Sequence, residues 1–590
     1  MARSPAYNKD GVLRVTVYVE GEPMPADYQL VALDVHNAVN RIGKAALVLH
    51  VRDTEWGQIS VADGPVFEPG KAIAVSAGYG DDEDSIFEGM VTALQLNVDG
   101  TEGIKLAVEC RDLAYPMTQG NRQDCYEDMS DGDIIEQVIG NYKLEANVAS
   151  GTVVHERVVQ YFQNDWDFIR RCADAQGWVL ITNGTSISVK PPDVAGAPAL
   201  VVTYGVDMVA FDAEWTAMDQ SADVVVRAWD PVNQSVLSVS AESATLNDQG
   251  DMDIAKLEAV AGQAVHTVAA QVADEQRMQQ EADARKLRQG LARIRGTCTF
   301  VGSAHIQPGQ LLELAGMGMK FNGNGYVGGV WHTVNNDGWL TQVTLGLPQD
   351  ENVASGRFSM SDMEGVAGLH VGVVVKLVDD PKNEFRVAIQ LPMIDQPAKQ
   401  VWARLAGSWA GNGYGALNVP DVGDEVVVGF QHGDPSHPII LGSLYSSKRV
   451  RPEELKQEND IHGIKTKSGI TVTLDDDQCA VNVATPGGIT IRASDKDKSV
   501  SVADMNGNKL SLSDGGIRLD AQKDIQIATK GNITMEAQGQ LQLKGTAGAA
   551  LSGSNVAIKA DTSATVKGNA SAELSAAGQT VVKGAMVMIN

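Results

Sequence analysis

The sequence predicts a mainly β protein with helical inserts, divided into several domains and ending in a β repeat. Three observations support this fold class: a length of 590 residues, short apolar segments that alternate with polar residues, and apolar pairs that recur every eight residues near the carboxyl end. A chain of this length exceeds what one hydrophobic core can organise. Alternation with period two is typical of strands, whereas neither a helix nor an ordinary sheet produces a period of eight.

The first part of the chain, to about Cys110, reads as a β-barrel-like module. Within it, residues 64–71 superficially resemble a phosphate-binding loop. The glycine spacing differs from that motif, and Ala72 stands where a Ser or Thr would hold Mg²⁺, so we expect no nucleotide site. Strands are expected at 15–19, 47–51, 73–79, 86–91 and 104–110.

A helical insert follows the first module. Residues 131–140 begin with acidic side chains, which suit a helix amino terminus, and repeat apolar residues at helical spacing. A second helix is expected from an Asn or Asp cap at 164–165 to Gly177. The stretch 260–291 is rich in Ala, Gln, Glu and Arg and lacks proline, so it predicts one long helix. A second β module is expected at 298–347.

The most legible domain covers residues 366–450. Its short alternating segments predict five strands that close into a small barrel of the oligonucleotide/oligosaccharide-binding type. Nucleic-acid binding needs basic and aromatic residues, but the clearest hairpin carries Asp421, Asp424 and Glu425, so we expect none. His432 and His437 flank Gly-Asp-Pro-Ser, which favours a β-turn over a metal site.

The final segment, 517–590, carries apolar pairs at positions i and i+2, which lie on one face of a strand. The pairs follow one another in eight-residue steps, with a single seven-residue step between Ala549 and Val556. Each unit offers too few inward residues for one chain to enclose a core, so the pattern predicts three chains wound together into a β-prism. The alternative, a disordered tail, would not keep apolar pairs in step over this length.

The larger members of these pairs are expected to form the core of the prism. They are Ile517, Leu519, Ile525, Ile527, Ile533, Met535, Leu541, Leu543, Leu551, Val556, Ile558, Val566 and Leu574. The last apolar strand predicts an open end that a partner caps. The residues expected at that end are Val582, Met586, Val587, Met588, Ile589 and Asn590.

Composition opposes several other functions. A net charge of −28 opposes binding to nucleic-acid phosphates and to anionic lipid headgroups. Five scattered cysteines, never spaced as CxxC, predict buried thiols without a disulfide framework or a zinc site. The acidic triplet 475–477 lacks the EF-hand pattern. We find neither a membrane-spanning apolar run nor a signal peptide, so we expect synthesis in a bacterial cytoplasm.

No catalytic residue is expected. Residues 407–411 miss the nucleophile-elbow pattern by one position, and residues 155–159 lack the second histidine of the zinc-protease motif. Carboxylates are so frequent among 75 acidic residues that no pair of them indicates glycosidase chemistry. We therefore expect a protein that is not an enzyme and that uses neither a cofactor nor a metal.

Motifs in the first 350 residues lie at 67–70, 87–89, 165–168 with Gly177, 302–309, and His332 with 345–346. Together they resemble the base domain of VgrG proteins and of the hub of contractile phage tails. The segment 423–445 more specifically resembles the barrel at the neck of VgrG and phage central-spike proteins. The resemblance implies two tube-like barrels per chain in the base, and a trimer that presents a pseudo-sixfold face to a tail tube.

These interpretations divide the chain into five parts. They are a base domain at 1–350, a linker at 351–365, the OB-fold domain at 366–450, a connector with strands leading into the needle at 451–516, and an octad-repeat β-helix needle at 517–590. The fold class is thus mainly β with helical inserts, forming a trimeric hub of tube-like barrels, an OB-fold barrel and an intertwined triple-stranded β-helix.

The resemblance implies a homotrimeric spike in the baseplate of a contractile injection apparatus, exported or extracellular after assembly. Type VI secretion, an extracellular injection particle and a phage tail all stay open. Such a spike caps the inner tube and punctures the target envelope mechanically. Expected partners are an inner-tube or tube-initiator protein, baseplate proteins and a PAAR-type tip protein. The alternative is a phage-tail-type spike with carbohydrate-binding or cell-wall-degrading activity, which would need an acidic cleft or aromatic sugar platforms.

Overall fold

The computed structural model describes residues 3–5, 11–51, 64–80, 82–99, 103–218, 220–251, 253–260, 265–269, 274–347, 366, 368–394 and 399–589. The chain divides into two compact units, Met1–Arg451 and Pro452–Asn590, and each is described by itself. The linker predicted at 351–365 lies outside the described residues. Within the described ranges, no helix combines the length and the apolar character needed to cross a bilayer.

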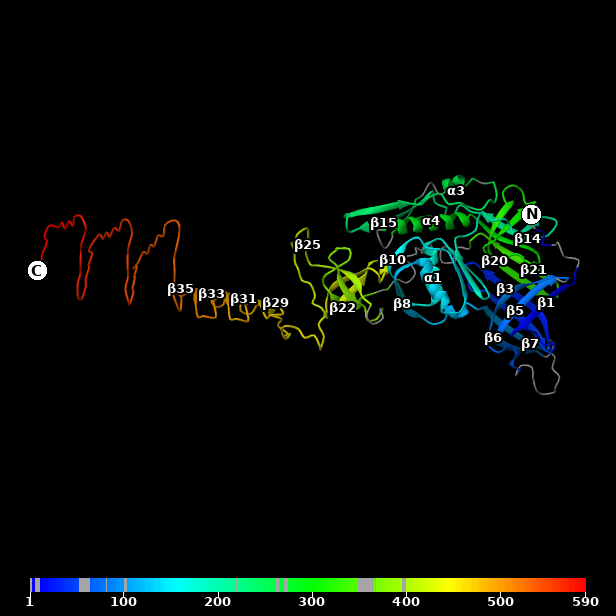
Figure 1. Ribbon diagram of the computed structural model, residues 1–590, viewed down its shortest axis with the longest axis horizontal. Coiled ribbons are helices and arrows are strands. Elements are labelled where there is room, and N and C mark those ends of the chain that lie inside the picture. The colour runs from blue at the N-terminus through cyan, green and yellow to red at the C-terminus, as the bar shows by residue number, and fades with distance from the viewer. Residues whose placement is uncertain are drawn as a thin grey trace. The chain divides into compact units, whose positions relative to one another are not determined.

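One sheet of 13 strands organises the first unit (Figure 1). Its strands are β1 (Leu13–Val19), β2 (Glu22–Pro23), β3 (Tyr28–Ala38), β4 (Lys44–Val51), β5 (Ala72–Tyr79), β6 (Asp82–Asp99), β7 (Gly103–Asp112), β13 (Leu200–Thr203), β14 (Met208–Trp215), β18 (Ile294–Val301), β19 (Leu311–Ala315), β20 (Gly323–Asn335) and β21 (Gly338–Leu345). They follow the order β14-β18-β21-β20-β3-β4-β7-β6-β5-β1-β2, and β19 pairs with both β20 and β13 beside this path.

Two hydrophobic cores form on this sheet, one for each half. Leu33, Val75 and Val108 belong to the core of β1–β7, and Phe300 and Val343 to the core of the later strands. The halves join where β20 runs antiparallel to β3. All five strands predicted before Cys110 are present, and the long strand β3, which carries no clean alternation, was missed.

A helical insert connects the two halves. Ser130 caps the first helix and accepts a hydrogen bond from the backbone N–H of Asp133, and Asn164 caps the second by accepting from Asp167 N–H. Both predicted helices are confirmed, and Gly177 follows the second with φ +70°. The elements are η2 (Tyr115–Thr118), β8 (Arg122–Ser130), α1 (Asp131–Gly140), β9 (Glu145–Val148), β10 (Val154–Gln163), α2 (Asp165–Ala175), β11 (Val179–Asn183) and β12 (Ser186–Lys190).

The long helix predicted for 260–291 is wrong in its first half. The structure has α3 (Ile254–Val260), β17 (Val265–Ala269) and α4 (Glu275–Leu291) instead. Strand β17 runs parallel to β15 (Asp223–Asp230), which also pairs with β16 (Ser235–Ser240). Val265, Thr267 and Val268 are β-branched, so this short segment itself favours a strand, although the composition of the whole stretch favours a helix. Met278 and Ala282 of α4 pack under Val226 and Val239 of this small sheet.

The predicted five-strand barrel is confirmed. It closes in the order β22-β23-β24-β28-β27, and a hairpin of β25 and β26 projects from it. Val374, Ile389, Val426 and Ile440 fill its interior. The elements are β22 (His370–Lys376), β23 (Val387–Gln390), β24 (Val401–Leu405), β25 (Ala410–Gly411), β26 (Tyr414–Gly415), β27 (Glu425–Phe430), η4 (Gln431–Gly433) and β28 (Pro438–Ser443).

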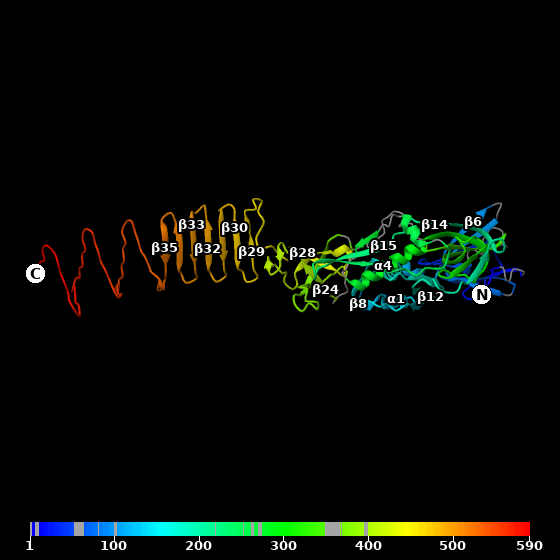
Figure 2. The same cartoon turned by 90° about the horizontal axis from the view of Figure 1, so that it is seen from above.

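The second unit begins with a seven-stranded antiparallel sheet in which each strand pairs with the next along the chain. Figure 2 shows these strands as successive rungs, after which the chain continues to wind back and forth. Every strand has five residues: β29 (Ile461–Lys465), β30 (Thr471–Asp475), β31 (Ala480–Ala484), β32 (Thr490–Ser494), β33 (Ser499–Ala503), β34 (Lys509–Ser513) and β35 (Gly516–Asp520). We call these strands the β29–β35 sheet, and residues 521–589 the octad segment.

Candidate assembly interface

The two faces of the β29–β35 sheet differ in chemistry. The register places Val472 opposite Val483, Val500 opposite Leu512, and Leu510 opposite Leu519. Because alternate residues of a strand share a face, the apolar residues align across all seven strands. The apolar face comprises Ile464, Val472, Leu474, Val481, Val483, Ile491, Val500, Val502, Leu510, Leu512, Ile517 and Leu519. His462 and Ala493 also lie on this apolar face. The other face carries Ser, Thr, Asn, Lys, Arg and Asp, together with Ile461 and a few Ala and Gly.

The apolar face is exposed in the single chain. Leu510 and Leu512 are each 37% exposed, and Ile517 is 77% exposed. A contiguous apolar patch of this kind marks an interaction surface, because water would otherwise order against it. From the sequence, this region is predicted only as strands that lead into the needle, and the common apolar face is not predicted. Its pairs follow in steps of seven to ten residues, so a search for a period of eight passes over them.

Locally hydrogen-bonded turns hold the β29–β35 sheet in register. Backbone bonds run from Gly469 N–H to Thr466 O, from Gly488 N–H to Thr485 O, and from Gly507 N–H to Asp504 O. These glycines have φ between +87° and +89°, a region that residues with a Cβ rarely adopt. The sheet is therefore specified by contacts between neighbouring strands of one chain.

The acidic triplet at 475–477 occupies one of these turns. Asp475 Oδ1 accepts a hydrogen bond from Gln478 N–H at 2.9 Å, and Asp477 pairs with Lys496. Within the described residues, no group of three His, Cys, Asp or Glu side chains is arranged to hold a metal ion. The carboxylates here support the turn.

The octad segment, predicted to form strands in a prism of three chains, has no strands in the structure of the single chain. None of the described residues 521–589 belongs to a strand. The predicted core residues of the prism are exposed, from 46% for Val556 to 88% for Val566. Only Ile517 and Leu519 of that set lie in a strand, β35, where they face Leu512 and Leu510. A strand needs a hydrogen-bonded neighbour, and the described octads have none within their own chain.

The residues predicted at the capped end are also exposed. Val587 is 50% exposed and Ile589 is 91% exposed, with Val582, Met586 and Met588 between these values. Asn590 lies outside the described residues.

The barrel is fixed to the helical insert by a shared core and several polar contacts. Cys125 and Val159 of the antiparallel pair β8 and β10 pack against the barrel interior. Lys399 donates to the Cys125 carbonyl, Arg157 Nη1 donates to Gln400 O at 3.2 Å, and Lys382 Nζ lies 2.7 Å from Glu156 Oε2. Apolar packing and polar contacts therefore both connect the barrel to the base.

The histidine pair in the barrel forms the predicted turn. Asp434 accepts hydrogen bonds from Ser436 N–H at 2.9 Å and from His437 Nδ1 at 3.3 Å. Burial opposes ionisation of Asp434, but the hydrogen bonds and charge of His437, with Arg277 nearby, outweigh it and hold the Asp434 pKa below its usual range. His432 takes φ +52° inside the turn. These side chains therefore stabilise local backbone.

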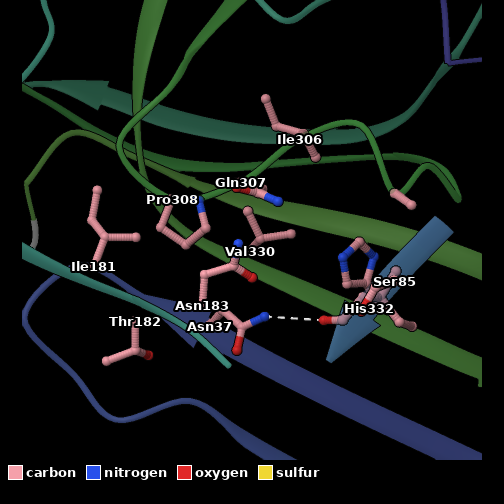
Figure 3. Close-up of a pocket in the computed structure, with 12 residues that line it drawn as sticks. Asn37, Ser85, Ile181, Thr182, Asn183, Ile306, Gln307, Pro308, Val330 and His332 are labelled. Atoms are coloured by element: carbon pink, nitrogen blue, oxygen red, sulfur yellow. Dashed lines mark hydrogen bonds between the residues drawn. The ribbon is translucent and has the colours of Figure 1, made fainter. Parts of the chain in front are cut away.

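A small pocket in the base contains the histidine that carried part of the family resemblance. Figure 3 shows His332 beside Asn37, whose amide donates to the Ile86 carbonyl at 3.2 Å. His332 is 2% exposed, and its Nδ1 lies 3.0 Å from Thr341 Oγ1. Burial lowers the pKa of His332 to about 4, so the ring is neutral at physiological pH. It is a core residue with a satisfied ring nitrogen.

The helical insert contains a buried acid, imidazole and thiol. His155 Nε2 lies 2.9 Å from Asp131 Oδ2, and both side chains are about 5% exposed. Cys172 is buried beside them, and burial raises its thiol pKa far above the ordinary value. A protonated, inaccessible thiol is a poor nucleophile. The prediction of buried cysteines holds for four of the five. It is wrong for Cys479, which lies exposed in the turn between β30 and β31.

Family models match two parts of the chain. The family described as "Alg8 N-terminal domain" matches residues 9–336, which contain the helical insert and every strand of the 13-stranded sheet except β21. The family described as "Type VI secretion system/phage-baseplate injector OB domain" matches residues 370–445, which contain the five-strand barrel.

Several curated relatives are named type VI secretion system spike proteins. The chain is 23% identical over 444 residues to the spike protein VgrG1b of Pseudomonas aeruginosa, covering 68% of this chain and 57% of the relative. It is 45% identical over 67 residues to VgrG5 of the same organism, covering 11% of this chain and 8% of the relative. The chain thus spans little more than half the length of VgrG1b, and a much smaller share of VgrG5.

A solved structure has a similar fold. A chain of the Francisella PdpA–VgrG complex in its half-lidded form superimposes with a TM-score of 0.52 at 8% identity, covering 86% of this chain and 87% of that chain. At this identity the likeness concerns the fold.

Proposed function

The chain belongs to the family of the Alg8 N-terminal domain and carries a type VI secretion system/phage-baseplate injector OB domain, and from this premise we propose that it is the homotrimeric central spike of a contractile injection apparatus. Its kinship with VgrG spike proteins supports the spike role. The trimer, the tip partner, the contact with an inner tube and the puncturing step are all parts of this proposal.

The main support for the proposed trimer is the exposed apolar face of the β29–β35 sheet. Its residues are exposed in one chain, and the same i and i+2 pairing continues through the octad segment. Three copies can bury these faces against each other around one axis, which removes both the apolar surface and the free sheet edges. Residues 452–590 would then form a stiff shaft.

The base domain is proposed to contact the inner tube, and residues 582–590 to contact a PAAR-type tip protein. The first assignment rests on the family resemblance. The second also rests on the exposed valine, methionine and isoleucine side chains near the end of the shaft. Apolar side chains at an exposed end favour a partner that covers them.

We propose no bond-making step. Relatives that match the chain are named spike proteins, and one relative named for actin cross-linking, VgrG1 of Vibrio cholerae, matches over 67 residues that cover 6% of its length. The thiol and histidines that most resemble catalytic groups are buried in cores or engaged in turns. The phage-tail alternative with cell-wall-degrading activity stays a prediction.

The mass of the purified full-length protein in solution tests the proposal. Sedimentation velocity should give a species with three times the mass of the chain, and limited proteolysis should leave residues 461–589 intact. A well-folded monomer whose last hundred or so residues are digested rapidly would contradict the spike function. Clearing of peptidoglycan or polysaccharide by the same preparation would favour the enzyme alternative.

A further inference from the structure

The octad segment does not by itself specify how three chains align. Apart from the seven-residue step after Ala549, its pairs recur every eight residues, so a slip of one chain by one unit again places apolar pairs opposite apolar pairs everywhere except at that step. Register is weakly specified wherever a repeat can slide onto itself. None of the described residues in this segment forms a ladder within its own chain that could fix the alignment.

The β29–β35 sheet has the opposite property. Each strand pairs with its sequence neighbour, and each connection from β29 to β34 contains a backbone hydrogen bond, such as Cys479 N–H to Asp476 O and Lys498 N–H to Asp495 O. Contacts between neighbours along the chain form quickly and do not depend on protein concentration. The sheet can therefore fold before the chains meet.

A slip between preformed sheets is also costly. Strand direction alternates, so the smallest slip that keeps it is two strands, which would leave two of the seven strands unburied. In the octad segment, a slip leaves only one short unit without partners. Docking of the β29–β35 sheets consequently discriminates against misalignment more strongly than octad pairing does.

Resting on the proposed trimer, we propose that the β29–β35 sheet is the registration clamp of the shaft: three copies dock through the apolar face first, and the octad segments then wind together from residue 521 onward. Docking raises the effective concentration of the three octad segments for one another. After docking, the octad segments, which lack strand partners in their own chain, can pair with the octad segments of the other two chains. The partner for the apolar face is thus the same face of two further copies.

Three substitutions in the full-length chain test the order of assembly. Val502→Asp places a charge on the apolar face, and Ser501→Asp, one residue away on the polar face opposite Arg492, is its matched control. Leu541→Asp places the same charge in the octad segment, where Leu541 is 56% exposed. Oligomeric mass by sedimentation and the protease cleavage map of residues 461–589 are measured for each.

We expect Val502→Asp to raise the dissociation concentration of the trimer more than about tenfold and to expose the whole octad segment to protease, because a buried charge disfavours docking. Ser501→Asp should behave as the wild type. Leu541→Asp should keep the trimer and the protected sheet and gain cleavage only beyond the sheet. An unchanged melting transition of the base shows that each variant is folded.

Two results would overturn the clamp. One is dissociation of the trimer by Leu541→Asp to the same degree as by Val502→Asp, and the other is an intact trimer in Val502→Asp. Both leave the spike function standing, because the wild-type chain is trimeric in either case. A monomeric wild type would instead contradict the proposed function itself.

Discussion

At the scale of single residues, histidines in this protein serve the fold. Part of the family resemblance rests on His332, and a histidine in a motif suggests a binding role. The structure places it in the core of the base, next to Trp339, with ring centroids 5.8 Å apart. His437 likewise completes a turn by bonding Asp434. In both cases the motif corresponds to packing or turn geometry, which the sequence cannot distinguish from a ligand site.

The buried imidazole predicts a pH dependence of stability. The pKa of His332 is about 4 in the fold, against about 6.5 in an unfolded chain, so the unfolded state gains a proton first as the pH falls. The contribution of the neutral His332 ring to the free energy of unfolding is fully present above about pH 6.5 and is lost progressively down to about pH 4. Between pH 7 and pH 5 the loss from this group should be about 2 kcal/mol.

The measurement is urea unfolding followed by tryptophan fluorescence at pH 7 and pH 5. His332→Asn keeps a polar atom near Thr341 Oγ1 and removes the titrating ring, so its base domain should show a smaller difference between the two pH values. Equal pH differences in the wild type and in the variant would show that His332 does not titrate in this range.

At the scale of elements, local sequence decided some segments and tertiary pairing decided others. Helices α1 and α2 were predictable because their caps and apolar spacing lie within the segments themselves. Strand β17 was not predicted, because the Ala- and Gln-rich composition of 260–291 as a whole favours a helix, whereas Val265–Ala269 contains β-branched residues and pairs with β15, some forty residues away. The β29–β35 sheet was predicted only in part. Its apolar pairs are unevenly spaced, and they can be recognised as one face only once the strands are paired in register.

The connection between β22 and β23 depends on one carboxylate. Asp380 accepts hydrogen bonds from the N–H groups of Glu384 and Arg386 and from the Arg386 guanidinium, and its side chain is 7% exposed. The hydrogen bond from Arg386 holds the Asp380 pKa well below its usual range. Its stabilising contribution is therefore present above about pH 4 and is lost only as the pH falls further.

Asp380→Asn should destabilise the barrel by about 2 kcal/mol at pH 7, because a charge-assisted network loses its acceptor. Asp379→Asn is the control: Asp379 pairs with Lys376 but is 73% exposed, and such a surface pair contributes little. Thermal unfolding of the full-length protein, monitored by hydrogen exchange in residues 370–445, separates the two. Equal destabilisation by both substitutions would contradict the role assigned to Asp380.

At the scale of the whole molecule, charge is distributed unevenly along the chain. The protein carries a net charge of −28, yet residues 521–590 contain six lysines against four acidic residues. Repulsion from an anionic envelope would therefore act on the base and barrel and not on the octad segment. This distribution suits entry of the octad segment, the last part of the proposed shaft, into an envelope while the base and barrel stay behind.

The proposed capped end gives a prediction for the assembled spike. Deleting residues 584–590 removes Met586, Met588 and Ile589, which are 78%, 82% and 91% exposed. Binding of a PAAR-type tip protein, measured by biolayer interferometry, should be lost, because the apolar contact surface is gone. The trimer should persist, because the β29–β35 sheet is untouched. Unchanged tip binding would refute the assignment of this end.

The sequence alone determined the mainly β class, the five-strand barrel, the two capped helices and the octad period, because each of these leaves a pattern of alternation, capping or spacing among residues close along the chain. Only the tertiary structure decided the joining of the two base halves through β3 and β20, the capture of β17 by β15, and the alignment of scattered apolar pairs into one face on the β29–β35 sheet. These features depend on which distant segments meet. The free energy that stabilises them comes from apolar surface that distant segments bury together, and local propensity does not indicate which segments will meet.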